Sequence, residues 1–197
     1  MVVLCVVWLW AGTGDARAQA LIDHVVARVN GVLLLLSDVR AAAGFRMVEA
    51  GPEAQQVRQL VQRQLLLGEV LRFPPPEPPA VDVAAEVARM KAQVTDPAAF
   101  LVAQGLTDAD VTAMARDTLR VQAYLAQRFG SNAPVSDDAA LEYYKAHPAE
   151  FTRDGVLQSF EAALGAARER VATERRREAV AQWLRDLESR AEVSMPR

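Results

Sequence analysis

Apolar residues are concentrated on both sides of Asn30 and Gly31, in the stretch from Leu21 to Leu36. Asn-Gly is the dipeptide best suited to a two-residue type I′ turn, because both central positions need a positive φ. The stretch therefore predicts two strands joined by this turn. We expect a helix to follow, with Ser37 capping its first N–H groups and Asp38 close to its positive end.

From residue 53 onward, apolar positions recur at helical spacing. Segment 53–73 predicts a well-buried helix, because its apolar stripe is wider than a single seam. The proline-rich stretch 73–79 ends it, since prolines supply no N–H groups and favour extended geometry. We interpret this stretch as a stiff connector inside the domain; a recognition motif for a proline-binding module is the alternative.

Several more helices are predicted beyond the connector. The first covers residues 81–94. Pro97 opens a short helix that Gly105 terminates, and a capping box at Thr107 begins a long helix reaching Phe129. The remaining two are a short helix over 137–146, capped by Ser136, and a long amphipathic helix over 157–192.

The terminal helix carries many arginines and glutamates opposite its apolar line. We interpret them as a solvated face with i,i+4 ion pairs. The whole pattern predicts a mostly α fold, a multi-helix core with a small N-terminal β-hairpin and a long C-terminal helix. The long helix is also a candidate surface for forming a homodimer.

The first twenty residues have the organisation of a cleavable export signal. Residues 2–10 are uninterrupted apolar, and 16–20 provide small residues in an A-x-A arrangement. The run is shorter than the roughly 20 residues needed to span a bilayer. No Lys or Arg precedes it, which suggests that the true start codon lies upstream. We therefore expect a periplasmic protein that folds from residue 21 onward and has no transmembrane span.

Composition limits the kinds of catalytic and metal-binding chemistry expected of the mature chain. The only cysteine, Cys5, lies inside the predicted signal, so no disulfide, thiolate metal site or cysteine nucleophile is expected. The formal charge of −3 argues against nucleic acid as the main partner. The two histidines, His24 and His147, belong to no recognisable metal or triad spacing, and the sequence contains no phosphate loop or hydrolase motif. We expect no catalytic site, metal or cofactor.

Several motifs follow one another in an order typical of a known family. They are residues 25–31 (VVARVNG) with 35–38 (LLSD), 60–67 (LVQRQLLL), the helix break from Phe100 to Thr107, 135–138 (VSDD), 143–148 (YYKAHP), Phe151, Trp183 and 191–193 (AEV). Together they resemble the SurA-type periplasmic chaperones, a family associated with peptidyl-prolyl isomerases that escorts outer-membrane proteins. The motifs cover nearly the whole expected mature chain.

The resemblance implies a particular domain organisation. In that family the N-terminal helices and the last helix form one core module, and parvulin-type isomerase domains are inserted before the last helix. The insertion point falls near residues 152–158 here, where only a few residues are present. With the signal at 1–20, the resemblance thus implies an N-terminal helical domain at 21–150 and a segment at 151–197 that completes the same core and packs back on it.

The function expected from these observations is binding without catalysis. The chain would hold unfolded or extended polypeptides, such as outer-membrane protein precursors, on shaped apolar surface where Met and aromatic side chains adapt to different partners. A minimal peptidyl-prolyl isomerase and a non-catalytic envelope assembly subunit are the alternatives. The candidate groove residues are Met90, Phe100, Met114, Tyr124 and Phe129, with Tyr143, Tyr144 and Trp183 as further candidates.

Overall fold

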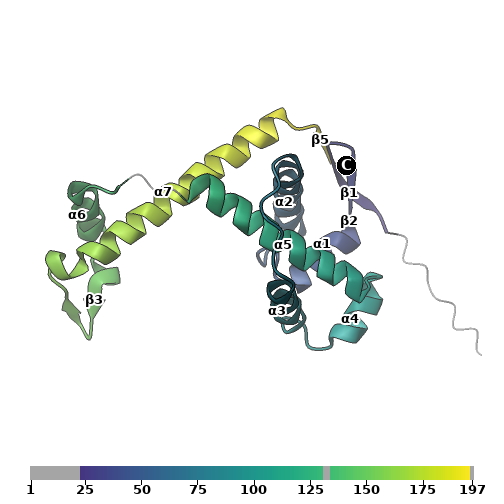
Figure 1. Cartoon of the computed structure of the whole chain (residues 1–197), viewed down its shortest axis with the longest axis horizontal. Helices are drawn as coiled ribbons and strands as arrows, with labels where there is room; N and C mark the ends of the chain where they lie inside the picture. The colour runs from purple at the N-terminus through teal and green to yellow at the C-terminus, as the bar shows by residue number, and fades with distance from the viewer. Residues whose placement is uncertain (1–22, 131–133, 196–197) are drawn as a thin grey trace, which may run out of the picture.

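The structure is a computed structural model that describes residues 23–130 and 134–195, so the predicted signal lies outside it. Its described part is mostly helical, with a small N-terminal hairpin and a long C-terminal helix, as the sequence predicts (Figure 1). The strands are β1 (Val25–Val29), β2 (Val32–Leu35), β3 (Thr152–Arg153), β4 (Val156–Leu157) and β5 (Val193–Ser194). The helices are α1 (Leu36–Gly44), α2 (Glu53–Arg72), α3 (Ala80–Lys91), α4 (Pro97–Gln104), α5 (Asp108–Phe129), α6 (Asp137–Ala146), the 3₁₀ turn η1 (Pro148–Phe151) and α7 (Phe160–Arg190).

The N-terminal hairpin has the predicted turn. Asn30 and Gly31 have φ values of 48° and 86°, as a type I′ turn requires. The predicted cap is wrong, because α1 begins two residues earlier, with Leu35 at its N-cap. The Asp38 carboxylate accepts a hydrogen bond from the Leu35 N–H at 2.8 Å, while the Ser37 hydroxyl donates to Asp23.

The proline-rich connector lies against α5. Pro75 is buried, and the carboxylate of Glu77 forms ion pairs with Arg116, at 3.0 Å, and with Arg120. These pairs fix the connector on the helix that α3 also contacts. The stretch therefore links α2 to α3 within the fold.

The end of the chain returns to its beginning. Strand β5 pairs antiparallel with β1, which gives a three-stranded sheet in the order β2-β1-β5. The C-terminal half of α7 packs against α2 and α5. Figure 1 shows this half of α7 running above α2 toward the sheet.

The other half of α7 belongs to a smaller lobe. Figure 1 shows α6 and the β3–β4 hairpin gathered around this end of α7, away from the sheet and α1–α4. Their side chains form an apolar cluster of their own around Phe151, Ala163 and Ala167. Two inter-element ion pairs add to it, Arg168–Asp137 and Arg170–Glu150. We call α6, η1, β3, β4 and the first half of α7 the distal lobe.

Candidate binding groove

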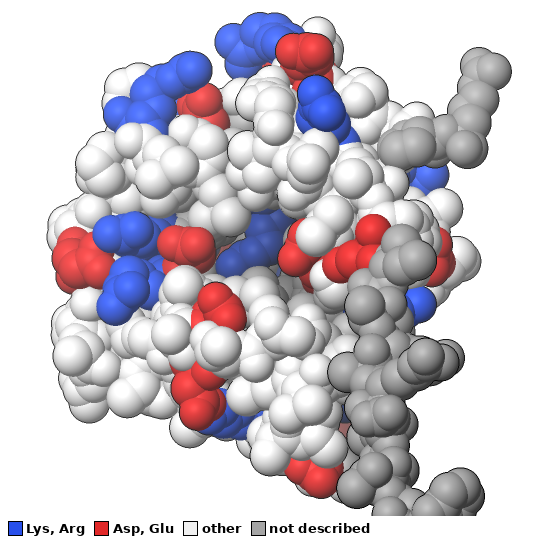
Figure 2. All heavy atoms as spheres, turned by 90° about the vertical axis from the view of Figure 1, so that its right-hand side faces the viewer, with Lys and Arg blue, Asp and Glu red and all other residues white. Residues whose placement is uncertain are grey.

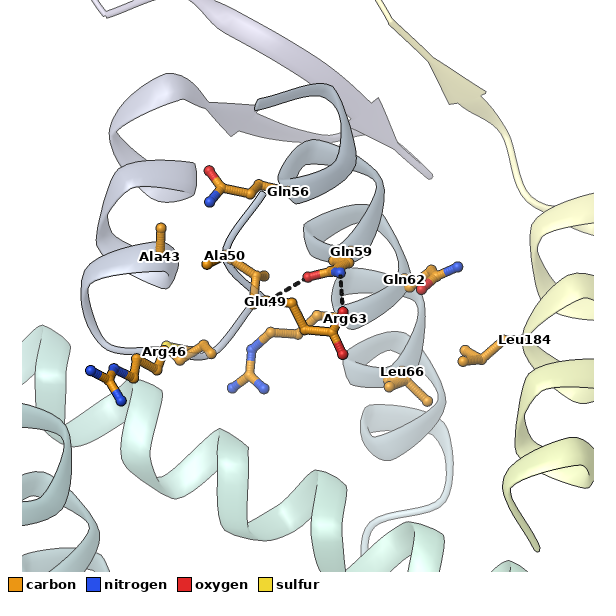
Figure 3. A pocket seen from close by; sticks show the side chains of 12 residues that line it. Ala43, Arg46, Glu49, Ala50, Gln56, Gln59, Gln62, Arg63, Leu66 and Leu184 are labelled. Carbon is orange, nitrogen blue, oxygen red and sulfur yellow. Dashed lines mark hydrogen bonds between the residues drawn. The ribbon is translucent and has the colours of Figure 1, made fainter. Parts of the chain in front are cut away.

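A large cleft opens beside α2. It has a volume of about 780 Å³ and is bounded by the α1–α2 loop, by one face of α2 and by α7 (Figure 3). Its lining residues are Ala43, Arg46, Met47, Val48, Glu49, Ala50, Gln56, Gln59, Gln62, Arg63, Leu66 and Leu184. A cleft of this size is in the range that accommodates ligands.

A row of polar side chains on α2 forms one wall of this cleft. Gln56, Gln59 and Arg63 follow one another at helical i, i+3 and i+7 spacing, so they share a face. Gln59 fastens the loop to the helix, because its Oε1 accepts a hydrogen bond from the Glu49 N–H at 2.7 Å. The dashed lines of Figure 3 mark this contact and the second one, from the Gln59 amide to the Glu49 carboxylate.

Arg63 is the most enclosed charge of the cleft. Its Nη2 donates a hydrogen bond to Thr118 Oγ1 on α5 at 2.8 Å, and the Thr118 hydroxyl donates in turn to the Met114 carbonyl. Burial lowers the pKa of the Arg63 guanidinium, and the negative charges of Asp117 and Glu86 act in the opposite direction. The guanidinium is therefore a cation held in a poorly hydrated place.

A second cleft, of about 480 Å³, lies between α5 and α7 and is lined mainly by aliphatic carbon. Arg176 and Arg177 add two cations to its lining. The residues lining it are Gln122, Leu125, Ala126, Arg176, Arg177, Val180, Ala181 and Leu184.

Leu184 lines both clefts, so a polar and an apolar part adjoin at this residue. In Figure 3 its side chain, on α7, faces Leu66 on α2. We call the two clefts together the binding groove. It is an open concave surface with a polar end, an apolar end and Leu184 between them.

An aromatic cluster holds α7 in place beside the groove. The Trp183 ring lies 5.9 Å from Tyr124 and 5.4 Å from Phe129, both on α5, measured between ring centroids. The Arg128 guanidinium lies 4.9 Å from the centroid of the Trp183 ring, a cation–π distance. Because Trp183 directly precedes Leu184, this cluster fixes where the groove residue lies.

The five candidate residues from the sequence fall into two separate apolar clusters. Met90, Phe100 and Met114 pack together around Phe45, whereas Tyr124 and Phe129 pack around Trp183. Met90 is 0% exposed, so it cannot touch a bound chain in this conformation. Phe100 packs edge-on against Phe45 with centroids 5.2 Å apart.

Two of the five candidates line smaller clefts. Tyr124 lies in one of about 500 Å³ beside Phe73, and Met114 in one of about 240 Å³ beside β2. Figure 2 shows the side of the molecule at the right of Figure 1, where acidic and basic side chains are interspersed and a hollow holds recessed basic atoms. None of the five lines the binding groove. Tyr143 and Tyr144 belong to the distal lobe, and Trp183 is buried.

The groove residues on α2 were missed at the sequence level because they look like a solvated face. The apolar residues of α2, such as Leu60 and Leu65, do face the core as predicted. The polar stripe is occupied by glutamine rather than by Lys and Glu. Uncharged amides at helical spacing are the signal that distinguishes this wall from an ordinary exposed face.

The two histidines take part in local packing. His147 stacks on Tyr143 with ring centroids 4.1 Å apart, and its Nδ1 lies 3.0 Å from the Tyr143 carbonyl. His24 is exposed just before β1.

Across residues 23–130 and 134–195, no group of three or more His, Cys, Asp or Glu side chains is arranged to hold a metal ion. No helix within the same ranges has the length and apolarity needed to cross a bilayer.

No family model matches this chain, and no curated protein matches it in sequence.

Proposed function

We propose that this chain is a periplasmic chaperone-like protein that binds unfolded or extended polypeptides, such as precursors of outer-membrane proteins, without catalysis. The observation that carries the proposal is the binding groove. It joins an amide-lined wall on α2 to an aliphatic surface between α5 and α7, and both parts are open.

An extended polypeptide has the chemistry that such a groove accommodates. Its main chain presents N–H and C=O groups along its length, and its side chains alternate between two sides. Each glutamine amide can both donate and accept hydrogen bonds, so Gln56 and Gln62 suit main-chain groups whatever the sequence, while Gln59 holds Glu49. The aliphatic end suits apolar side chains of the same segment. This combination favours broad binding of many clients.

The sequence resemblance supports the same proposal. The SurA-type core is a helical module whose last helix returns to the first, and here β5 pairs with β1 while α7 contacts α2 and α5. The position where that family carries its isomerase insert corresponds to the short β3–β4 hairpin. On this reading the chain is a binding core without the catalytic domain.

A second candidate function, an envelope assembly subunit, is favoured by the tip of the distal lobe. Val156 and Leu157 of β4 are 69% and 48% exposed. Exposed apolar side chains at one point can dock a single partner. Pull-down from envelope extract separates the two functions, because a chaperone retains many clients weakly and a subunit retains one partner stoichiometrically.

The direct test is suppression of aggregation of a urea-unfolded outer-membrane porin. We expect the protein with its natural sequence to keep the porin in solution, and Ala126→Glu to weaken this effect severalfold by placing a charge in the apolar end. Ala123→Glu is the matched control, since Ala123 is also exposed on α5 but lies outside the groove. A protein that neither suppresses aggregation nor binds an aromatic-rich peptide would rule out the proposed function. A protease-coupled assay should show proline isomerisation at the background rate.

A further inference from the structure

Arg63 has more hydrogen-bonding capacity than the fold uses. Its one hydrogen bond, to Thr118 Oγ1, occupies one of several guanidinium N–H donors. Within residues 23–130 and 134–195 no other acceptor lies within hydrogen-bonding distance of it, and no carboxylate lies within 4.0 Å. Asp117 and Glu86 act on it only through space. A cation taken out of water with so few partners is costly, unless a ligand completes its surroundings.

The surroundings of Arg63 contain further unused donors. The side-chain amides of Gln56 and Gln62 line the same cleft and make no hydrogen bonds to the described residues. Figure 3 shows that these side chains project from the same helix as Arg63, with Gln56 and Gln62 pointing away from its guanidinium, so Arg63 is the donor at its own end of the cleft. The planar guanidinium of Arg63 presents paired N–H donors that match the two oxygens of a carboxylate.

The charges near Arg63 determine how much negative charge a bound anion can carry. Glu49 lines the same cleft, and Asp117 and Glu86 already offset part of the Arg63 charge. A phosphate dianion would meet repulsion from these groups, whereas a single negative charge can be balanced. The site thus favours a carboxylate over a phosphate.

We propose that Arg63 is a recognition site for a carboxylate of the bound polypeptide, at the polar end of the binding groove. The inference rests on the proposed function and adds a chemical preference to it. The carboxylate comes from the carboxyl terminus of the client or from an Asp or Glu side chain. Apolar residues of the same client segment then extend past Leu184 to the α5–α7 cleft.

The test uses three labelled peptides that share one aromatic-rich sequence. One has a free carboxyl terminus, the second a carboxyl-terminal amide, and the third an amide with an internal Glu. Fluorescence polarisation should show that at least one acidic peptide binds about tenfold more tightly than the neutral amide, as expected for charge-assisted hydrogen bonds. The peptide that gains affinity identifies the source of the carboxylate.

Variants separate the recognition site from general charge. Arg63→Gln should remove the tenfold preference, so that the acidic peptides bind no more tightly than the neutral amide peptide. Arg63→Lys should retain only part of it, because an ammonium lacks the planar fork. Arg58→Gln, at an exposed position of α2 outside the cleft, should keep the full preference. Circular dichroism establishes that each variant is folded.

The outcomes distinguish this inference from the proposed function. Equal affinity for acidic and neutral peptides, or a preference that survives Arg63→Gln, would overturn the carboxylate site while peptide binding stands. If no peptide binds, the proposed function fails, and an NMR titration with sodium acetate then decides the site. A saturable shift of the Arg63 Nε–Hε signal, absent with equal sodium chloride, supports it; no shift overturns it.

Discussion

Asn30 and Glu192 exchange two hydrogen bonds although they lie 162 positions apart in the chain. The Asn30 N–H donates to the Glu192 carbonyl at 2.8 Å, and the Glu192 N–H donates to Asn30 Oδ1 at 3.0 Å. Asn30 thus has two roles, because it also takes the positive φ of the hairpin turn. Through this residue the first turn of the fold holds the end of α7 and β5.

Replacing Asn30 should therefore loosen the closure of the fold. Asn30→Ala loses both the acceptor and the tolerance for positive φ, so we expect the free energy of unfolding to fall by about 2 kcal/mol. Urea denaturation followed by circular dichroism measures this. Asn30→Asp keeps an acceptor and a residue that tolerates the turn, and should lose less than half as much. Equal losses in the two variants would contradict the role given to the side chain.

Gly44 and Gly68 should respond oppositely to the same substitution. A Cβ at Gly44, the last residue of α1, would overlap the ring of Phe100 on α4. Gly44→Ala should therefore destabilise the protein by about 1–3 kcal/mol through displaced core packing. A Cβ at Gly68, in α2, meets nothing within 4 Å. Gly68→Ala should stabilise by roughly 0.5–1 kcal/mol, because alanine is the better helix former. Thermal unfolding of both variants checks the pair, and a stabilising Gly44→Ala would show that α1 and α4 are not in close contact.

The ion pair on α3 predicts how stability depends on acid. Arg89 donates to the buried Glu86 carboxylate, with Nε to Oε2 at 2.7 Å, and this hydrogen bonding lowers the Glu86 pKa from its ordinary value of 4.5. A carboxyl whose pKa is lower in the folded than in the unfolded state stabilises the fold above the unfolded pKa. That contribution is lost as pH falls below about 4.5 toward the folded value.

Glu86→Gln tests this relation. The urea midpoint of the natural protein should fall as the pH drops below about 4.5, and the variant should show a shallower fall over the same range. Arg89→Met should flatten the fall as well, because it removes the group that lowers the Glu86 pKa. An unchanged slope in Glu86→Gln would assign the acid sensitivity to other carboxylates.

Local signals in the sequence predicted most of the helices. The positive φ of Gly105, the capping box at Thr107 and the start of α6 after Ser136 depend on a few neighbouring residues, and all are found. The same kind of signal was overlooked at Asp154 and Gly155. This pair has φ values of 51° and 78° and joins β3 to β4, but the strands have two residues each, too few to show an alternating pattern.

Features that depend on contacts between distant segments leave no signal in the nearby sequence. Strand β5 exists because Val193 and Ser194 pair with β1, a contact that no spacing near residue 193 reveals. The i,i+4 ion pairs expected on α7 are not found among its described residues, where Arg168 pairs with Asp137 on α6 and Arg170 with Glu150 on η1. The binding groove also depends on where α7 crosses α2 and α5. Helical periodicity shows which residues share a face of a helix, but not whether that face packs in the core or lines a groove. It therefore predicts Met90 as a groove residue and does not predict Gln59.

Site-specific photo-crosslinking tests the central claim, that the groove at Leu184 holds polypeptide, most directly. A benzophenone amino acid placed at Ala126, in the apolar end, should crosslink to an unfolded porin, and the same probe at Ala123 should not. Excess unlabelled aromatic-rich peptide should suppress the crosslink at 126. Equal yields at the two positions, or no crosslink at 126 while the porin stays bound, would contradict the account.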